Sequence, residues 1–383
     1  MGIITKIKRY FDCSLFKRLF YNCALNYYKK QKTIEFLAQF QNKKILLVNA
    51  SPIIEGMFQQ RPHHLVNFLK NYFDYVFYIS YRVQTPKPFK DNVFEVPYLP
   101  VIKTNNKIFY YLSSVNCLSV NEFKELKKAS YKVIYDYYDE ISDDIANSKN
   151  ALNAHKILNK LKIDITIASS AKLYNDLIDL KIKNPLLIKN GVTIEDFEKT
   201  LNNPPDDIKT LLDKPIVGYY GYLSNWIDFY LIEECLKKLP CCNFVFIGKF
   251  INYLNDNNLR KYPNYHYLGY KNYKDLYKYS SFFNCAIIPF KEGKIAKATS
   301  PNKLFEYMAK GIPCVCTKDL VECKNYKGVF VSNNSESFIE DIKKAVLLKQ
   351  DSRIVECLKN QAKENSWENK ANIIIEKIKE IGL

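Results

Sequence analysis

The sequence predicts an α/β protein with two doubly wound domains, each a mostly parallel sheet with helices on both faces. Short apolar runs typical of buried parallel strands alternate with amphipathic helical stretches, and this rhythm occurs twice along the 383 residues. A polar segment with paired prolines, "EKTLNNPPDDIKTLLDK", separates the two occurrences. We expect one domain over residues 43–195, a linker over 196–213 and a second domain over 214–365, facing a central cleft at the carboxyl ends of their strands.

The first residues, 1–42, predict a basic amphipathic helical extension. Apolar residues recur at helical spacing from Ile4 to Cys23, and basic residues outnumber Asp12 and Glu35. Such a helix could place residues 1–40 in the headgroup region of an anionic leaflet, on the inner face of the plasma membrane. Packing on the protein's own surface or on a partner explains the pattern equally well. No transmembrane or signal segment is evident, so we expect a cytoplasmic protein.

The first domain is expected to begin with a strand at "KKILLVNA", followed by a helix at "QRPHHLVNFLKNY". Further strands are predicted at "DYVFYIS", "KVIYDYYD", "DITIASS" and "PLLIKNGV", with helical stretches such as "NAHKILNKLK" between them.

The second domain repeats the pattern. Strands are predicted at "PIVGYYG", "NFVFIGKF", "YHYLGY", "NCAIIPF", "IPCVCT" and "GVFVS", with a helix at "WIDFYLIEECLKKL". Three helices close the chain, the last of them within residues 366–383.

The run "TSPNKLFEYMAKGIPCVC" predicts a helix over about residues 301–310. Ser300 is a good N-cap, and Pro301 suits the first helical position because its missing N–H would be unsatisfied there. Gly311 is a stop signal.

Two charges near the start of this helix suggest a ligand. Free N–H groups and Lys303 favour an anion such as phosphate, and Glu306, one turn deeper, could accept from a pair of hydroxyls. An anion beside a diol is typical of a nucleotide's phosphate and ribose. The alternative is a capped core helix with a solvated Lys/Glu side.

The composition limits the classes of binding partner that we expect for this protein. A net charge of +17 fits nucleic acid, an anionic membrane or phosphorylated substrates, and a composition bias of the source genome is the alternative explanation for part of the excess. No nucleic-acid motif is present and the aromatic residues do not gather with basic ones, so nucleic acid is not expected. The eleven cysteines show no metal-binding spacing, and no metal is expected.

The order "VGYYGYLSNW…FVFIGKF…YHYLGY…CAIIPF…SPNKLFEYMAKGIPCV…SWENKANIII" resembles the nucleotide-sugar domain of retaining group-1 GT-B glycosyltransferases. "QRPHHL" and "YDYYDE" resemble the subgroup related to teichuronic-acid and other surface-polysaccharide transferases. The resemblance covers about residues 43–383. It implies two Rossmann-like domains, a nucleotide-sugar donor, and a closing helix at 366–383 that crosses back to the first domain.

The resemblance also implies the donor-binding residues. Glu306 bonds the ribose hydroxyls, and the diphosphate lies near the helix start and the turn that begins at Gly218, with lysines as its partners. The donor set is Gly218, Gly221, Tyr222, Lys297, Ser300, Pro301, Lys303 and Glu306. The sequence departs from the family at Ala298, where many relatives carry a second Glu, and after Gly221, where Arg and Lys are absent.

The catalytic and acceptor residues are expected in the first half. Asp136 and Asp139 follow a predicted strand and could orient the acceptor hydroxyl or accept its proton, although Asp136 could equally anchor a loop. His63 and His64 could contact the sugar or acceptor, or pack on the helix. Arg61 is a candidate for an anionic acceptor group such as a lipid diphosphate.

The predicted function is transfer of a sugar from a nucleotide-diphosphate donor to a bacterial surface-glycan acceptor, such as capsule or a lipid-linked glycan. We expect retention, and no metal or other cofactor, since the donor half lacks a DxD-type carboxylate pair. Two alternatives stay open. One is a GT-B sugar-nucleotide epimerase, and the other is a non-catalytic scaffold or glycan-binding protein, which Ala298 favours.

Overall fold

The computed structural model describes residues 14–50, 59–80, 82–99, 101–102, 104–114, 118–141, 155–156, 158–199, 201, 203–251 and 255–381, with residues 14–21 by their backbone alone. The chain divides into two compact units. Unit 1 takes the described residues of Met1–Pro52, Lys70–Leu112 and Leu118–Ile134, and unit 2 those of Ile53–Leu69, Ser113–Cys117 and Tyr135–Leu383.

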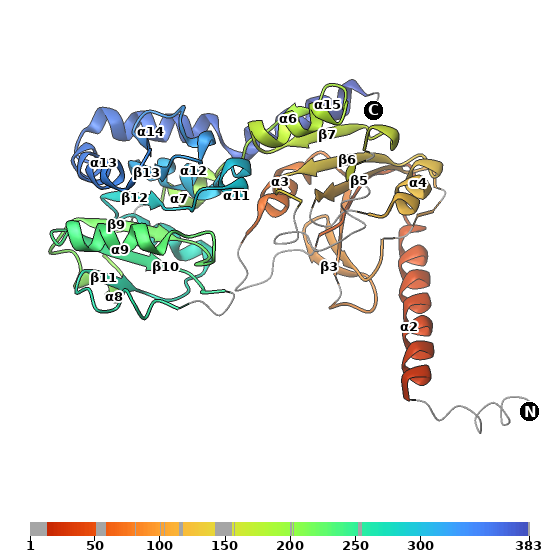
Figure 1. Ribbon diagram of the computed structural model, residues 1–383. Coiled ribbons are helices and arrows are strands. Elements are labelled where there is room, and N and C mark those ends of the chain that lie inside the picture. The colour runs from red at the N-terminus through yellow and green to blue at the C-terminus, as the bar shows by residue number, and fades with distance from the viewer. Residues whose placement is uncertain are drawn as a thin grey trace, which may run out of the picture. The chain divides into compact units, whose positions relative to one another are not determined.

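An eight-stranded sheet has the order β3-β4-β2-β1-β5-β6-β7-β8. Figure 1 labels its strands β3, β5, β6 and β7. Its strands are β1 (Lys44–Val48), β2 (Tyr75–Ile79), β3 (Lys87–Lys90), β4 (Val93–Val96), β5 (Lys107–Ser113), β6 (Lys132–Tyr137), β7 (Ile165–Ala168) and β8 (Leu186–Leu187). β1 pairs in parallel with β2 and β5, while β3 pairs antiparallel with β4 at the sheet edge. The five predicted strands of this half are confirmed, and β3, β4 and β5 are additional.

A six-stranded sheet in unit 2 has the order β11-β10-β9-β12-β13-β14, and every pairing in it is parallel. Its strands are β9 (Ile216–Tyr220), β10 (Asn243–Ile247), β11 (Tyr265–Tyr267), β12 (Cys285–Ile288), β13 (Cys314–Thr317) and β14 (Val329–Ser332). The central strands are buried along their whole length, as expected of a parallel sheet covered on both faces. One mostly parallel sheet and one wholly parallel sheet, both with alternating helices, confirm the predicted α/β class.

The helices lie between the strands and at the chain end. They are α2 (Ser14–Leu37), α3 (Arg61–Leu69), α4 (Val120–Lys128), α6 (Ala171–Asp179), α7 (Ile194–Phe197), α8 (Asp206–Lys209), α9 (Phe229–Lys238), α10 (Leu276–Ser280), α11 (Lys294–Ala298), α12 (Asn302–Ala309), α13 (Ser335–Leu348), α14 (Ser352–Glu364) and α15 (Trp367–Glu380). Short 3₁₀ turns occur at Leu158–Lys160, Tyr273–Asp275 and Val321–Cys323. The three closing helices are confirmed.

The predicted start of α12 is wrong by one residue. Pro301 is the N-cap and the helix begins at Asn302, because the Ser300 hydroxyl accepts a hydrogen bond from the Asn190 N–H instead of capping the helix. Gly311 has φ +62°, the left-handed conformation expected just after a helix end.

Helix α2 is anchored in unit 1 by its last turns. Phe36 packs against Phe77 and Phe94, with ring centroids 6.1 and 5.4 Å away. Farther toward the N-terminus, Tyr27 and Tyr28 are exposed. Residues 1–13 lie outside the described residues, so the amphipathic extension stays a prediction there. In the part of the chain that the structure describes, no helix is long and apolar enough to span a bilayer.

Candidate functional site

Lys303 and Gly221, two predicted donor residues, lie side by side. Gly221 directly follows β9 and has φ +136°, and a Cβ there would lie 3.1 Å from Lys303 Cε and 3.2 Å from Lys303 Nζ. The lysine Nζ also lies 5.1 Å from the Tyr219 ring centroid and 5.3 Å from that of Phe290. Among the described residues Lys303 forms no ion pair, and burial lowers its pKa to about 8. A cation without a carboxylate partner beside a glycine turn suits a phosphate.

Glu306 lies one turn farther along α12 and is only 4% exposed. Burial raises its pKa to about 7, against the opposing effects of the Tyr220 and Tyr273 hydroxyls and of Lys303. Both hydroxyls are buried near the carboxyl group, yet neither completes a hydrogen bond of normal geometry within the described chain. Polar atoms left unsatisfied around a buried carboxyl group are suited to a ligand that brings hydroxyls of its own.

The other predicted donor residues play different parts. Gly218 lies within β9, where a Cβ would lie 2.0 Å from the Phe283 ring, so its missing side chain serves core packing. Tyr222 is 36% exposed beyond the Gly221 turn. The Lys297 side chain is 55% exposed and lies 3.8 Å from Asp319.

Asp136 and Arg61 form a buried ion pair. We use the name acceptor side for the predicted catalytic and acceptor-binding residues, which are Arg61, His63, His64, Asp136 and Asp139. Arg61 Nε donates to both carboxylate oxygens at 3.0 and 2.8 Å, and both side chains are at most 1% exposed. Asp136 therefore already has a partner, and the pair is a fixed piece of structure.

Asp139 differs from Asp136, because its carboxyl group has a raised pKa. Burial and the negative charge of Asp136 raise the pKa of Asp139 to about 7, while Arg61 has the opposite effect. A carboxyl group that titrates near neutral pH can both hold and accept a proton, which a carboxylate locked to arginine does poorly.

The two histidines of α3 are held differently. His63 Nδ1 accepts a hydrogen bond from the Gln60 N–H at 3.0 Å, so the neutral ring carries its proton on Nε2 and can donate from there. His64 stacks on Trp367 at 5.1 Å and 7°, and burial together with His63 lowers the pKa of His64 to about 3. His64 is a neutral packing residue in this structure.

Asn190 is the residue that the sequence analysis missed. Its Oδ1 accepts from Arg61 Nη1 at 2.9 Å, its Nδ2 donates to the Ser300 carbonyl oxygen, and its N–H donates to Ser300 Oγ at 3.2 Å. The signal was the short run "NGV", which is weak when taken singly.

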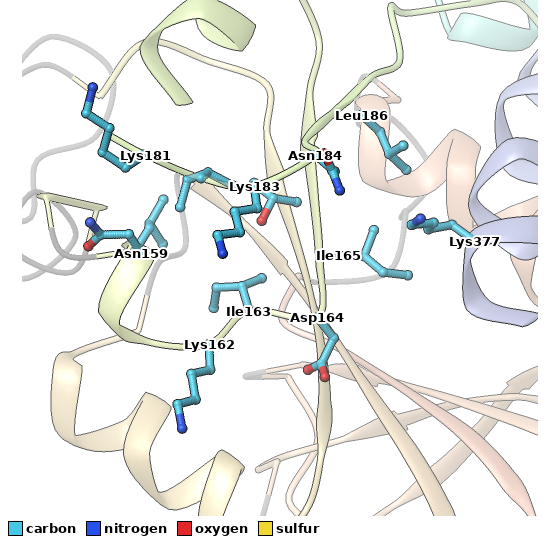
Figure 2. Close-up of a pocket in the computed structure, with 13 residues that line it drawn as sticks. Asn159, Lys162, Ile163, Asp164, Ile165, Lys181, Lys183, Asn184, Leu186 and Lys377 are labelled. Carbon is cyan, nitrogen blue, oxygen red and sulfur yellow. The ribbon is translucent and has the colours of Figure 1, made fainter. Parts of the chain in front are cut away.

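A separate cavity of about 220 Å³ lies at the starts of β7 and β8 (Figure 2). Lys183 extends into it from the β8 loop and Lys377 from α15 (Figure 2). None of the predicted site residues lines this cavity. Within the described ranges, no group of three or more His, Cys, Asp or Glu side chains is arranged to hold a metal ion.

Comparison with solved structures decides the fold. The chain is similar to sucrose-phosphate synthase from Thermosynechococcus elongatus, with a TM-score of 0.68 and 13% identity over 89% of this chain and 99% of that one. It is also similar to Anabaena Alr3699/HepE in complex with UDP and glucose, with a TM-score of 0.65 and 16% identity over 88% and 100% of the two chains. The chain has the GT-B fold.

A curated relative agrees with the GT-B fold. The "Putative teichuronic acid biosynthesis glycosyltransferase TuaH" of Bacillus subtilis (strain 168) is 25% identical over 199 residues, which are 49% of this chain and 50% of the relative. The match thus spans about half the length of each protein. No protein-family model matches the chain. The predicted resemblance to GT-B glycosyltransferases is confirmed.

Proposed function

We propose that the protein is a glycosyltransferase that moves a sugar from a nucleotide-diphosphate donor to a bacterial surface-glycan acceptor. The observation that carries the proposal is the first half of α12, where Lys303 lies beside the Gly221 turn and the buried Glu306 carboxyl group lies near the hydroxyls of Tyr220 and Tyr273. A diphosphate beside Lys303 and ribose hydroxyls beside Glu306 would satisfy both groups. The UDP and glucose named for Anabaena HepE are ligands of this kind.

The proposed chemistry needs the leaving diphosphate to be stabilised as negative charge builds on it. Lys303 and the N–H groups at the start of α12 can supply that stabilisation from fixed positions. We propose that the reaction proceeds with retention and without a metal, as the resemblance to group-1 enzymes implies.

On the acceptor side, the proposal assigns the proton to Asp139. Its pKa of about 7 suits acceptance of a proton from an attacking hydroxyl near neutral pH, while the bond to Arg61 holds the Asp136 side chain in place. His63, near the start of α3, would contact the sugar or the acceptor. The acceptor itself, lipid-linked or another glycan, would approach Asp139, while Arg61 stays paired with Asp136.

We also propose that residues 1–40 hold the enzyme on an anionic membrane surface, near a lipid-linked acceptor. The support is the exposed pair Tyr27 and Tyr28 next to Lys29 and Lys30, since aromatic and basic side chains together favour the headgroup region. Co-sedimentation with vesicles that contain phosphatidylglycerol tests this part. Equal binding to phosphatidylcholine vesicles, or none to either, would contradict it.

The test of the donor is a thermal-shift panel with UDP, GDP, CMP, ADP, dTDP and their common sugar conjugates, with and without Mg²⁺. A ligand that binds only the folded state, present at 100 times its Kd, adds about 2.7 kcal/mol of stability. One nucleotide should stabilise the wild type but not Glu306→Gln. Glu336→Gln, at an exposed glutamate of α13, controls for the chemical change. No shift with any nucleotide would contradict the proposal.

The scaffold alternative rests on Ala298, which is buried in α11 at the position where many relatives carry a carboxylate. Nucleotide binding without transfer to any acceptor would favour it. Donor turnover without an acceptor would instead favour an epimerase.

A further inference from the structure

A chain of hydrogen bonds connects the acceptor side to the start of α12, within unit 2. It begins at the Asp136 carboxylate, passes through the Arg61 guanidinium to Asn190 Oδ1, and continues from Asn190 to Ser300. Ser300 precedes α12 by two residues and is 2% exposed. Only two side chains, Arg61 and Asn190, therefore lie between the acceptor-side carboxylate and the segment that opens α12.

The partners of Asn190 fix the orientation of its amide. An arginine can only donate and a backbone carbonyl can only accept, so the oxygen must face Arg61 and the nitrogen must face Ser300. Few residue types can do both at this length. Aspartate would keep the bond to Arg61 but would place an oxygen against the Ser300 carbonyl oxygen.

The backbone that follows Asn190 is also held by contacts with residues 365–367. A Cβ on Gly191 would lie 2.4 Å from the Asn365 carbonyl oxygen, and the Val192 N–H donates to that oxygen at 3.2 Å. The Trp367 N–H in turn donates to the Val192 carbonyl oxygen at 3.0 Å. Residues 190–192 thus join the segment before α12 to the start of α15.

Trp367, which bonds to the Val192 backbone, also contacts residues of α3. The Trp367 ring stacks on His64, and the Arg61 guanidinium carbon lies 5.8 Å from the centroid of the Trp367 ring. Arg61 Nη2 is buried without a partner in the described chain, so the bonds through Nε and Nη1 alone hold the guanidinium. Removing the Asn190 amide would leave Nη1 unpaired too.

We propose that Asn190 is a positioning residue that fixes Arg61 and Asp136 against the start of α12, so that acceptor and donor meet in a reactive geometry. The inference rests on the glycosyltransferase function proposed above. Lys303 and Glu306 sit on α12 itself, so donor affinity does not depend on Asn190. The rate of transfer does, because a misplacement of about 1 Å between reacting groups can cost roughly 100-fold.

Three variants test the proposal. Asn190→Ala removes both amide contacts. Asn190→Asp keeps the bond to Arg61 but replaces the donor to Ser300 with an oxygen that faces the Ser300 carbonyl oxygen. Ser300→Ala removes the hydroxyl while keeping the carbonyl that accepts from Asn190. For both Asn190 variants we expect kcat to fall by about 10- to 100-fold with the nucleotide Kd within about twofold of wild type. For Ser300→Ala we expect a loss below about fivefold.

A purely structural role would give a different result. It would weaken nucleotide affinity together with kcat, whereas positioning lowers kcat while the nucleotide Kd stays within about twofold of wild type. Hydrogen exchange adds a readout independent of transfer: without nucleotide, α3 and residues 186–192 should exchange faster in Asn190→Asp than in the wild type, while exchange in α12 stays the same.

The failures can be told apart. A wild type that binds no nucleotide overturns the proposed function and the inference with it. A wild type that binds nucleotide, together with an Asn190→Asp variant whose kcat is unchanged or whose α3 exchanges no faster than in the wild type, overturns the inference alone.

Discussion

The two sides of the candidate site hold their buried charges in opposite ways. Arg61 and Asp136 neutralise each other through two hydrogen bonds, whereas Lys303 and Glu306 form no ion pair within the described chain, and burial moves the pKa of each toward neutrality. A buried charge without a partner is costly unless something else satisfies it. The paired charges therefore behave as structure, and the unpaired ones mark where a ligand is expected.

Arg61→Met tests the paired side with the largest expected effect. It leaves the Asp136 carboxylate buried without a counter-charge, so the free energy of unfolding should fall by about 3–5 kcal/mol. Urea denaturation measures the change. The double variant Arg61→Met/Asp136→Leu removes both charges and should recover much of the loss. A single variant as stable as wild type would show that the pair is not a fixed piece.

Lys303→Met tests the unpaired side. A charge-assisted hydrogen bond to phosphate contributes about 1.5–3 kcal/mol, so the affinity for the nucleoside diphosphate should fall by roughly 10- to 100-fold. The free energy of unfolding should not fall, because the substitution removes a buried charge that forms no ion pair. Isothermal titration with the diphosphate and with the matching nucleoside separates the two contributions. Equal losses for both ligands would argue against a phosphate contact.

The sequence predicted the unpaired side better than the paired one. Lys303, Glu306 and the Gly311 stop are local features of one helix, and spacing along the chain locates them without knowledge of distant residues. The contacts of Arg61 depend on residues 75 and 129 positions away. No local pattern encodes such a pairing, so the structure was needed to show that Arg61 and Asp136 hold each other.

The sheets show the same division. Strands that stand between helices, such as β1 and β9, follow from the alternating rhythm of apolar runs. β5 pairs with β1 in the middle of its sheet, yet it follows the β3–β4 hairpin, and the rhythm gives no strand there. The sequence order of a hairpin inserted into a parallel sheet breaks the βα alternation on which the prediction relied.

The pH dependence of donor binding sharpens the unpaired side further. Glu306 must be ionised to accept from ribose hydroxyls, and its pKa of about 7 is set by burial, by Tyr220, Tyr273 and Lys303, and by the nearby charge of Asp196. Below pH 7 the affinity should fall by up to about tenfold per pH unit. Above the Lys303 pKa of about 8 it should fall again as the phosphate partner loses its charge.

Titration calorimetry between pH 5.5 and 9 should therefore show an optimum between about 7 and 8, and Glu306→Gln should lose the acidic limb. The raised pKa of Glu306 also makes the free energy of unfolding depend on pH. Because the folded state holds the Glu306 proton up to a higher pH than the ordinary 4.5, this group's contribution to the free energy of unfolding falls as pH rises from about 4.5 to 7. A pH-independent nucleotide affinity would remove the carboxylate from the ligand contact.

Lys297→Met should have the smallest effect on nucleotide affinity. It tests whether a lysine that already has a carboxylate partner contributes to donor binding. Lys297 was predicted beside Lys303 as a phosphate partner, but its side chain is 55% exposed and Asp319 lies 3.8 Å away. An exposed, paired lysine contributes about 0–1 kcal/mol, so nucleotide affinity should change by no more than about fivefold. The Lys303→Met variant, measured under the same conditions, is the matched comparison. A loss at Lys297 as large as at Lys303 would mean that an exposed cation with its own carboxylate can still bind the ligand strongly, and that the absence of an ion pair does not identify the donor site.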